Sequence, residues 1–106
     1  MFDNAALLEP GRGDQIFRIA LASGHGLERN PPIRLSRAET PARRPDLSGR
    51  RVVWQSESLA EDGTHDLVVG GFDRRGGTRR PRTLVALEGD QLDARIDGRW
   101  VAWKAV

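Results

Sequence analysis

One short phrase occurs twice in this chain at a fixed interval. Residues 45–54 are Pro-Asp-Leu-Ser-Gly-Arg-Arg-Val-Val-Trp, and residues 93–103 are Asp-Ala-Arg-Ile-Asp-Gly-Arg-Trp-Val-Ala-Trp. Gly49 lies 49 residues before Gly98, and Trp54 lies 49 residues before Trp103. A period of about 40–50 residues is typical of chains built from stacked supersecondary units. This interval constrains the architecture more than any other feature of the sequence.

The segments around the phrase have the composition of strands and turns. Short apolar runs alternate with clusters of glycine, proline, asparagine and aspartate, a pattern typical of strands separated by turns. The 12 glycines and 6 prolines in 106 residues leave little room for a long helix, and the best helical candidates (5–9, 36–40 and 56–61) are only a turn or two long. We predict an all-β chain with strands within residues 14–21, 33–36, 51–55, 66–72, 82–87 and 100–106.

The repeat divides the chain into two copies and a remainder. About four short strands fall in each copy, which predicts antiparallel four-stranded blades of the propeller type. The first copy is residues 1–49, the second is residues 50–98, and residues 99–106 are the first strand of an incomplete third copy. The first copy is degraded at its start, because Asp3-Asn4-Ala5 falls where Val52-Val53-Trp54 would map.

Two further positions align between the copies, and the phrase itself predicts tight turns. Ile16-Phe17 corresponds to Leu67-Val68, and Leu35 corresponds to Leu84. Ser48-Gly49 and Asp97-Gly98 fit two-residue hairpin turns, where glycine takes a positive φ without steric penalty.

The strands that follow these turns carry large side chains on one face. Trp54 shares a face with Val52, as Trp103 does with Val101, so we expect these residues to stack between adjacent blades. Trp100 has no aromatic counterpart, since Arg51 stands at its place in the other copy. We expect Trp100 to be exposed or to cover an end of an assembly, and it is a candidate binding residue.

With these residues in view, the chain resembles the TolB-like β-propellers of bacterial and archaeal surface or periplasmic proteins. Residues 45–54 match their repeat phrase, and Asp66-Leu67-Val68-Val69 supplies the strand that follows it. The second copy departs at Ala94, Asp97 and Ala102, which replace Pro, Ser and Val. The resemblance covers most of residues 14–106. It implies blades that bind proteins or ligands, in the periplasm or at the cell surface.

Residues that could support catalysis or metal binding are few. The chain has no cysteine, which excludes disulfides and thiolate metal sites. His25 and His65 are the only histidines; His65 follows Glu61 and Asp62, but the spacing is not that of a calcium loop, so a solvated turn is favoured. Arg12-Gly13-Asp14 resembles an adhesion tripeptide, although a turn before a strand is the simpler interpretation. We predict no enzyme activity and no cofactor.

The arginines form the other candidate site. The nine residues 74–82 contain five arginines, of which Arg74, Arg75, Arg79 and Arg80 are the candidate binding residues. They are predicted to form a solvated hairpin tip rather than a nucleic-acid site, because no aromatic residues lie among them and 17 basic residues against 15 acidic ones leave a net charge of only +2.

These observations favour a non-enzymatic propeller-type module for protein or ligand binding, either as a fragment of a larger propeller or as a self-associating unit. Three chains of two blades would make a six-bladed ring. An arginine-rich nucleic-acid or polyanion binder, and a blade pair from a propeller-capped hydrolase, remain as alternatives. No apolar run is long enough for a membrane span, and residues 1–10 lack the basic and apolar regions of a secretory signal.

Overall fold

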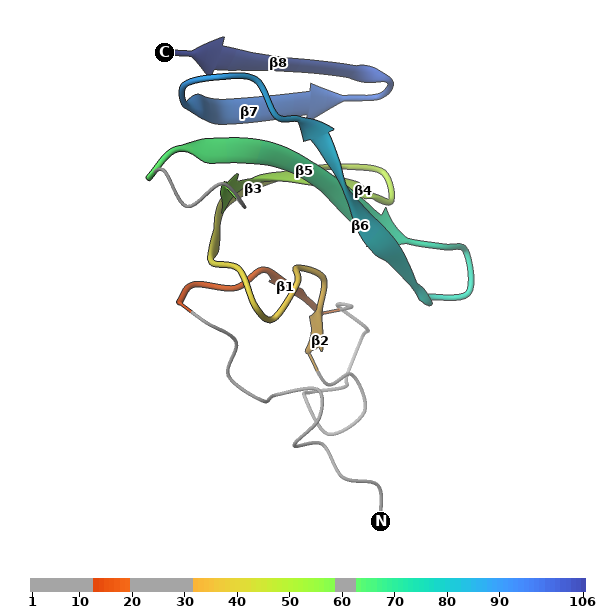
Figure 1. The fold of residues 1–106 in the computed structure, drawn as a ribbon. Coiled ribbons are helices and arrows are strands. Elements are labelled where there is room, and N and C mark those ends of the chain that lie inside the picture. Colours follow the sequence, from red (N-terminus) through yellow and green to blue (C-terminus); the bar gives the residue numbers. More distant parts are fainter. Residues whose placement is uncertain (1–12, 20–31, 59–62) are drawn as a thin grey trace.

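The computed structural model describes residues 13–19, 32–58 and 63–106, and these residues form strands and turns without a helix (Figure 1). Within this part of the chain there is accordingly no helix that could span a membrane. The strands are β1 (Phe17–Arg18), β2 (Ile33–Arg34), β3 (Ala42–Ser48), β4 (Arg51–Glu57), β5 (His65–Phe72), β6 (Thr78–Val85), β7 (Gln91–Asp97) and β8 (Trp100–Ala105). The prediction of an all-β chain is confirmed.

The central sheet is a four-stranded antiparallel meander in the order β3-β4-β5-β6. Consecutive strands pair because short turns return the chain directly beside itself. In β4, residues 52–56 are all buried, so both faces of this strand are covered, and the simple alternation of a one-sided sheet is absent there. Pro81 lies in β6, an edge strand of this sheet, where a missing N–H is tolerated.

Two further hairpins lie on either side of this sheet. β1 pairs with β2 near the N-terminal end, and β7 pairs with β8 at the C-terminal end. Figure 1 shows β7 between β8 and the central sheet, and β1–β2 on the opposite side. Each hairpin packs through its own cluster of buried side chains. One cluster joins Ile16, Leu35, Ala42, Val52, Trp54 and Val68, and the other joins Val53, Leu67, Ala94 and Ile96.

The β3–β4 and β7–β8 hairpins have the same internal pairing at an interval of 49 residues. Leu47 pairs with Val52, and Ile96 pairs with Val101. The register shifts between Arg43 and Asp46 in one hairpin and between Leu92 and Arg95 in the other. Each irregularity holds one residue with positive φ other than glycine, Arg44 at 53° and Asp93 at 54°. The two hairpins therefore share a β-bulge as well as a turn.

Packing between β4 and β5 depends on a glycine. Trp54 is 1% exposed, and a Cβ built on Gly70 would lie 2.7 Å from Cη2 of the Trp54 ring. The absence of a side chain at position 70 lets the indole lie flat against the neighbouring strand. This pair anchors the cluster beneath β1–β2.

Some sequence expectations differ from the structure. Residues 36–40 form a bend and turn, and Ser56 and Glu57 end β4, so neither helical candidate forms a helix at these residues. Ser56 and Glu57 instead continue the pairing of β4 with β5. The candidate at residues 5–9 lies outside the described residues, as does most of the remainder of 56–61. The boundary at residues 49 and 50 falls within the β3–β4 turn, whereas the hydrogen-bonded sheet spans residues 42–85.

Candidate functional site

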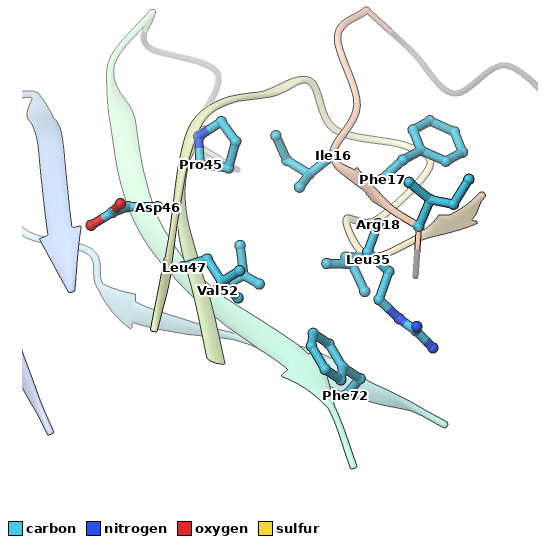
Figure 2. A pocket seen from close by; sticks show the side chains of 10 residues that line it. Ile16, Phe17, Arg18, Leu35, Pro45, Asp46, Leu47, Val52 and Phe72 are labelled. Carbon is cyan, nitrogen blue, oxygen red and sulfur yellow. The ribbon is translucent and has the colours of Figure 1, made fainter. Parts of the chain in front are cut away.

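An apolar cavity of about 350 Å³ opens between the β1–β2 hairpin and the central sheet (Figure 2). Ile16, Phe17 and Leu35 approach it from the β1–β2 side, and Leu47 and Val52 line it from the β3–β4 hairpin. Its volume lies at the small end of the range for ligand pockets. Leu47 lines this cavity and is 58% exposed.

A single arginine marks the rim of this cavity. The Arg18 guanidinium carbon lies 4.7 Å from the centroid of the Phe72 ring, a cation–π distance, and its Nη2 donates to the carbonyl oxygen of Gly76. Its Nε is buried and meets no acceptor among the described residues. Arg18 therefore fastens β1 to the end of β5 and to the turn that follows it.

The β7 strand is held against the central sheet by side chains that accept from its backbone. The N–H of Ile96 donates to Oδ2 of Asp46 at 2.7 Å, and the N–H of Gly98 donates to Oγ of Ser48 at 2.8 Å. The N–H at the bulge residue Asp93 donates to Oε1 of Gln55 at 2.8 Å. Because these three side chains accept from the N–H groups of Asp93, Ile96 and Gly98, those groups are satisfied without a neighbouring strand.

The same three positions differ on the β7–β8 hairpin. At the 49-residue interval, Arg95 stands for Asp46, Asp97 for Ser48 and Lys104 for Gln55. All three are exposed. This hairpin thus presents one acceptor and two cations where the β3–β4 hairpin presents three acceptors.

Trp100 lies at the start of β8 and is 76% exposed. By contrast, Trp103 is 39% exposed, and its Nε1 donates to Oε1 of the fully buried Gln91 at 2.8 Å. Large exposed aromatic side chains are enriched at protein interfaces. The β8 strand pairs only with β7 within the described chain, so its outer edge offers unpaired backbone groups.

Four arginines surround a hollow between the two glycine turns. The lining comprises Ser48, Gly49, Arg50, Arg51, Arg79, Gly98 and Arg99. None of the four arginines forms an ion pair with the described residues, and all are exposed. Arg43 and Arg44 do not join them, because Arg43 pairs with Asp14 at 3.0 Å and Arg44 with Asp93 at 3.4 Å. The hollow thus gathers four positive charges that have no ion-pair partner in the part of the chain that the structure describes.

The candidate arginines from the sequence are thus dispersed. Arg79 lines the hollow, whereas Arg74 and Arg75 lie in the turn between β5 and β6. Asp73 closes that turn by accepting from the N–H groups of Arg75 and Gly77. Arg80 follows Arg79 on β6 but does not line the hollow. The structure brings Arg79 together with arginines of the two glycine turns.

Of the two histidines, only His65 lies among the described residues, and its contacts are with Asp90. The backbone N–H of His65 donates to Oδ1 of Asp90 at 2.7 Å, and its Nδ1 lies 3.0 Å from the same oxygen. Glu61, Asp62, Arg12 and His25 lie outside the described residues. Among the residues that are described, no group of three or more histidines and acidic residues is placed to hold a metal ion.

Comparison of the chain with protein-family models, with curated proteins and with solved structures gives no match. What the chain does is therefore inferred from its own residues and geometry.

The residues that join the hairpins have no signal of their own in the sequence. Asp46, Ser48 and Gln55 are ordinary polar residues there, and their role depends on where the bulge places the next hairpin. Arg99 stands apart from the arginine-rich segment, and it becomes part of a cluster only through the turn that it shares with Gly98. The 49-residue interval is the one signal that could have found it, since it aligns Arg99 with Arg50.

Proposed function

We propose that this chain is a non-enzymatic repeat module of β-propeller type that binds protein through the open faces and edges of its hairpins. In this proposal the central sheet is one blade, and β1–β2 and β7–β8 are halves of its neighbours. The side-by-side packing of successive hairpins supports the blade interpretation, as does their shared turn and bulge.

One comparison within the molecule supports binding. Leu47 and Ile96 occupy the same place in the two twin hairpins, yet Leu47 is 58% exposed and Ile96 is 8% exposed. Ile96 is covered by Val53 of β4 and Leu67 of β5. Leu47 has no such cover among the described residues and lines the cavity instead. An apolar position that is buried in one unit and open in its twin favours a partner at the open one.

Site-specific photo-cross-linking tests this proposal. A photoreactive phenylalanine at position 47 should form a covalent adduct with a protein in the cells that produce the chain. The matched control is position 87, because Leu87 is 61% exposed but lies outside the cavity. Adducts from position 47 that are absent from position 87 support the proposal. Equal or absent adducts at the two positions contradict it.

The arginine hollow favours polyanion binding as a second candidate function. Its four arginines converge from two turns and two strands, and none forms an ion pair with an acidic partner among the described residues. Such a cluster attracts phosphate groups through a term that falls with added salt. No aromatic side chain lines the hollow on which a base would stack, which favours backbone contact without sequence preference.

Binding of a labelled oligothymidine at several salt concentrations tests this second function. Arg79→Ala combined with Arg99→Ala should weaken binding and reduce the salt slope, by about 0.7 for each phosphate of a single strand that the variant no longer neutralises. Arg74→Ala combined with Arg75→Ala removes the same charge away from the hollow and is the control. No binding at low salt, or equal weakening in the two double variants, would exclude the hollow as the site.

A further inference from the structure

The chain alternates between two kinds of hairpin. The inner kind comprises β3–β4 and β7–β8, which share their pairing at an interval of 49 residues. The outer kind comprises β1–β2 and β5–β6. Phe17 pairs with Arg34 as Val68 pairs with Thr83, and Arg18 pairs with Ile33 as Val69 pairs with Arg82.

Burial supports the match between the outer hairpins. The interval from β1 to β5 is 51 residues, which aligns Ile16 with Leu67. Both side chains are buried, Ile16 in the cluster with the β3–β4 hairpin and Leu67 in the cluster with β7. Each outer hairpin therefore packs against the inner hairpin that follows it in the chain.

Among the described residues, only the middle two hairpins form a complete four-stranded sheet. β4 and β5 pair along their whole length, with Trp54 opposite Val68 and Val52 opposite Gly70. The corresponding edges of β8 and β1 have no strand partner among the described residues. One end of the molecule thus offers an inner hairpin without its outer partner, and the other end offers the reverse.

We propose that β8 of one copy pairs in antiparallel fashion with β1 of a second copy, so that the two half-sheets form a four-stranded sheet equivalent to β3–β6. This inference rests on the proposed function and names the protein partner as the chain itself. The register follows from β4–β5: Trp103 lies opposite Phe17 of the second copy, and Val101 lies opposite its Ile19. Ile19 carries the side chain that Gly70 lacks, so the Trp103 ring does not lie against β1 as the Trp54 ring lies against β5.

The open cavity lies where this contact would cover it. Val53 covers Ile96 inside the chain, and the residue at the place of Val53 in β8 is Ala102. Pairing of β8 with β1 of a second copy brings Ala102 over Leu47 of that copy. Leu47, which is 58% exposed beside the cavity, would then be covered by a second copy as Ile96 is covered by Val53 inside one chain.

Charge also matches across the proposed contact. Within one chain, Nη1 of Arg44 at the first bulge lies 3.4 Å from Oδ1 of Asp93 at the next. When β8 of one copy pairs with β1 of the next, the bulge at Asp93 of the first copy lies beside the bulge at Arg44 of the second. Opposite charges therefore face each other at this joint as well. Like-charged bulges would have opposed the contact.

The joint between copies is the weaker of the two. Inside the chain Asp46 and Gln55 accept from backbone N–H groups of β7, but Arg95 and Lys104 stand at their places in the β7–β8 hairpin and cannot accept. Asp97 alone retains the acceptor role of Ser48. Association between copies is therefore reversible and depends on protein concentration.

Disulfide trapping tests the register, since the chain has no cysteine of its own. Ile19→Cys and Val101→Cys chains are mixed at a concentration where the wild type associates, and are oxidised mildly. The mixed adduct should exceed the half of all cross-links that random pairing of two thiols would give. Leu87→Cys replaces Val101→Cys in the control mixture and should give no such excess.

Random proportions of adducts, or a wild type that remains monomeric at every concentration, would overturn the inference. A photo-cross-link from position 47 to a different protein would overturn it too while leaving the proposed function intact. Absence of any specific adduct from position 47 would instead count against the proposed function itself.

Discussion

At the scale of single residues, the contact between the central sheet and β7 depends on side chains that accept from backbone donors. Asp46 is the clearest case, because its Oδ2 accepts from the N–H of Ile96 across 50 residues of sequence. Loss of an acceptor leaves a partly buried N–H without its partner, which costs more than the hydrogen bond contributes when it is present.

We expect Asp46→Ala to lower the free energy of unfolding by about 1–2 kcal/mol, whereas Asp46→Asn retains an acceptor oxygen and should be affected less. The matched control is Arg95→Ala, at the equivalent place in the other hairpin, where the side chain is exposed. Surface changes of that kind usually stay within about 0.5 kcal/mol. Urea unfolding of dilute protein measures all three, and equal destabilisation by Asp46→Ala and Arg95→Ala would show that the contact is unimportant.

Gly70 gives a second prediction at this scale. A Cβ at this position would lie 2.7 Å from the Trp54 ring, so Gly70→Ala should destabilise the fold by about 1–3 kcal/mol, the usual cost of overpacking. The cost should fall when Trp54→Phe removes the outer part of the indole. A double-mutant cycle from urea unfolding measures this coupling. Strict additivity of the two changes would contradict the packing described.

At the scale of elements, the shared bulge fixes how each inner hairpin bends. Arg44 and Asp93 adopt φ values of 53° and 54°, a region that costs any residue except glycine, and β-branched residues most. The bulge interrupts strand pairing between Arg43 and Asp46 in one hairpin and between Leu92 and Arg95 in the other. Such a bulge changes the direction of the strand that contains it.

We expect Asp93→Val to be less stable than Asp93→Gly by about 1–2 kcal/mol, because valine opposes the positive φ and glycine accepts it. Both variants remove the ion pair with Arg44 equally, so the loss of this ion pair does not contribute to the difference. Thermal unfolding of the two proteins gives the comparison. Equal midpoints would mean that position 93 does not require the left-handed conformation.

The sequence predicted most of the strands but not β3 or β7, and it placed the two glycine turns one residue too early, since Ser48 pairs with Arg51 and Asp97 with Trp100. It gave no indication of how the hairpins join. Gly49, Gly98 and the β-branched and aromatic residues after them predicted the hairpins because turn chemistry and strand preference are local. The bulge at Arg44 and Asp93 carries no local signal, since neither residue favours a positive φ as glycine does. The exposed Leu47 was likewise unpredictable, because its burial depends on a strand that is far away in the chain or in another molecule.

At the scale of the whole molecule, the order outer, inner, outer, inner gives each copy the equivalent of two four-stranded sheets. Head-to-tail joining uses two different surfaces, so it produces a ring when the rotation closes and a filament when it does not. Two, three or four copies would give rings of four, six or eight sheets, which covers the usual range of propellers. Three copies correspond to the six-bladed ring expected from the sequence.

Joining also predicts how single changes affect association. Ala102→Arg places a charge at an exposed position of β8 that the proposed joint brings over Leu47 of the second copy, and we expect it to abolish association. Its control, Leu87→Arg, introduces the same charge on the exposed loop before β7 and should leave association unchanged. Both proteins are compared by light scattering after far-ultraviolet circular dichroism has shown that they are folded. Equal association of the two variants would place the joint elsewhere.

The mass of the wild-type chain in solution shows whether half-sheets pair between copies. Sedimentation velocity over a wide range of protein concentration should show a monomer that converts to one closed species, with the mass of three chains expected and two or four also consistent with paired half-sheets. A folded protein that remains a monomer at the highest concentration would contradict the pairing of half-sheets between copies.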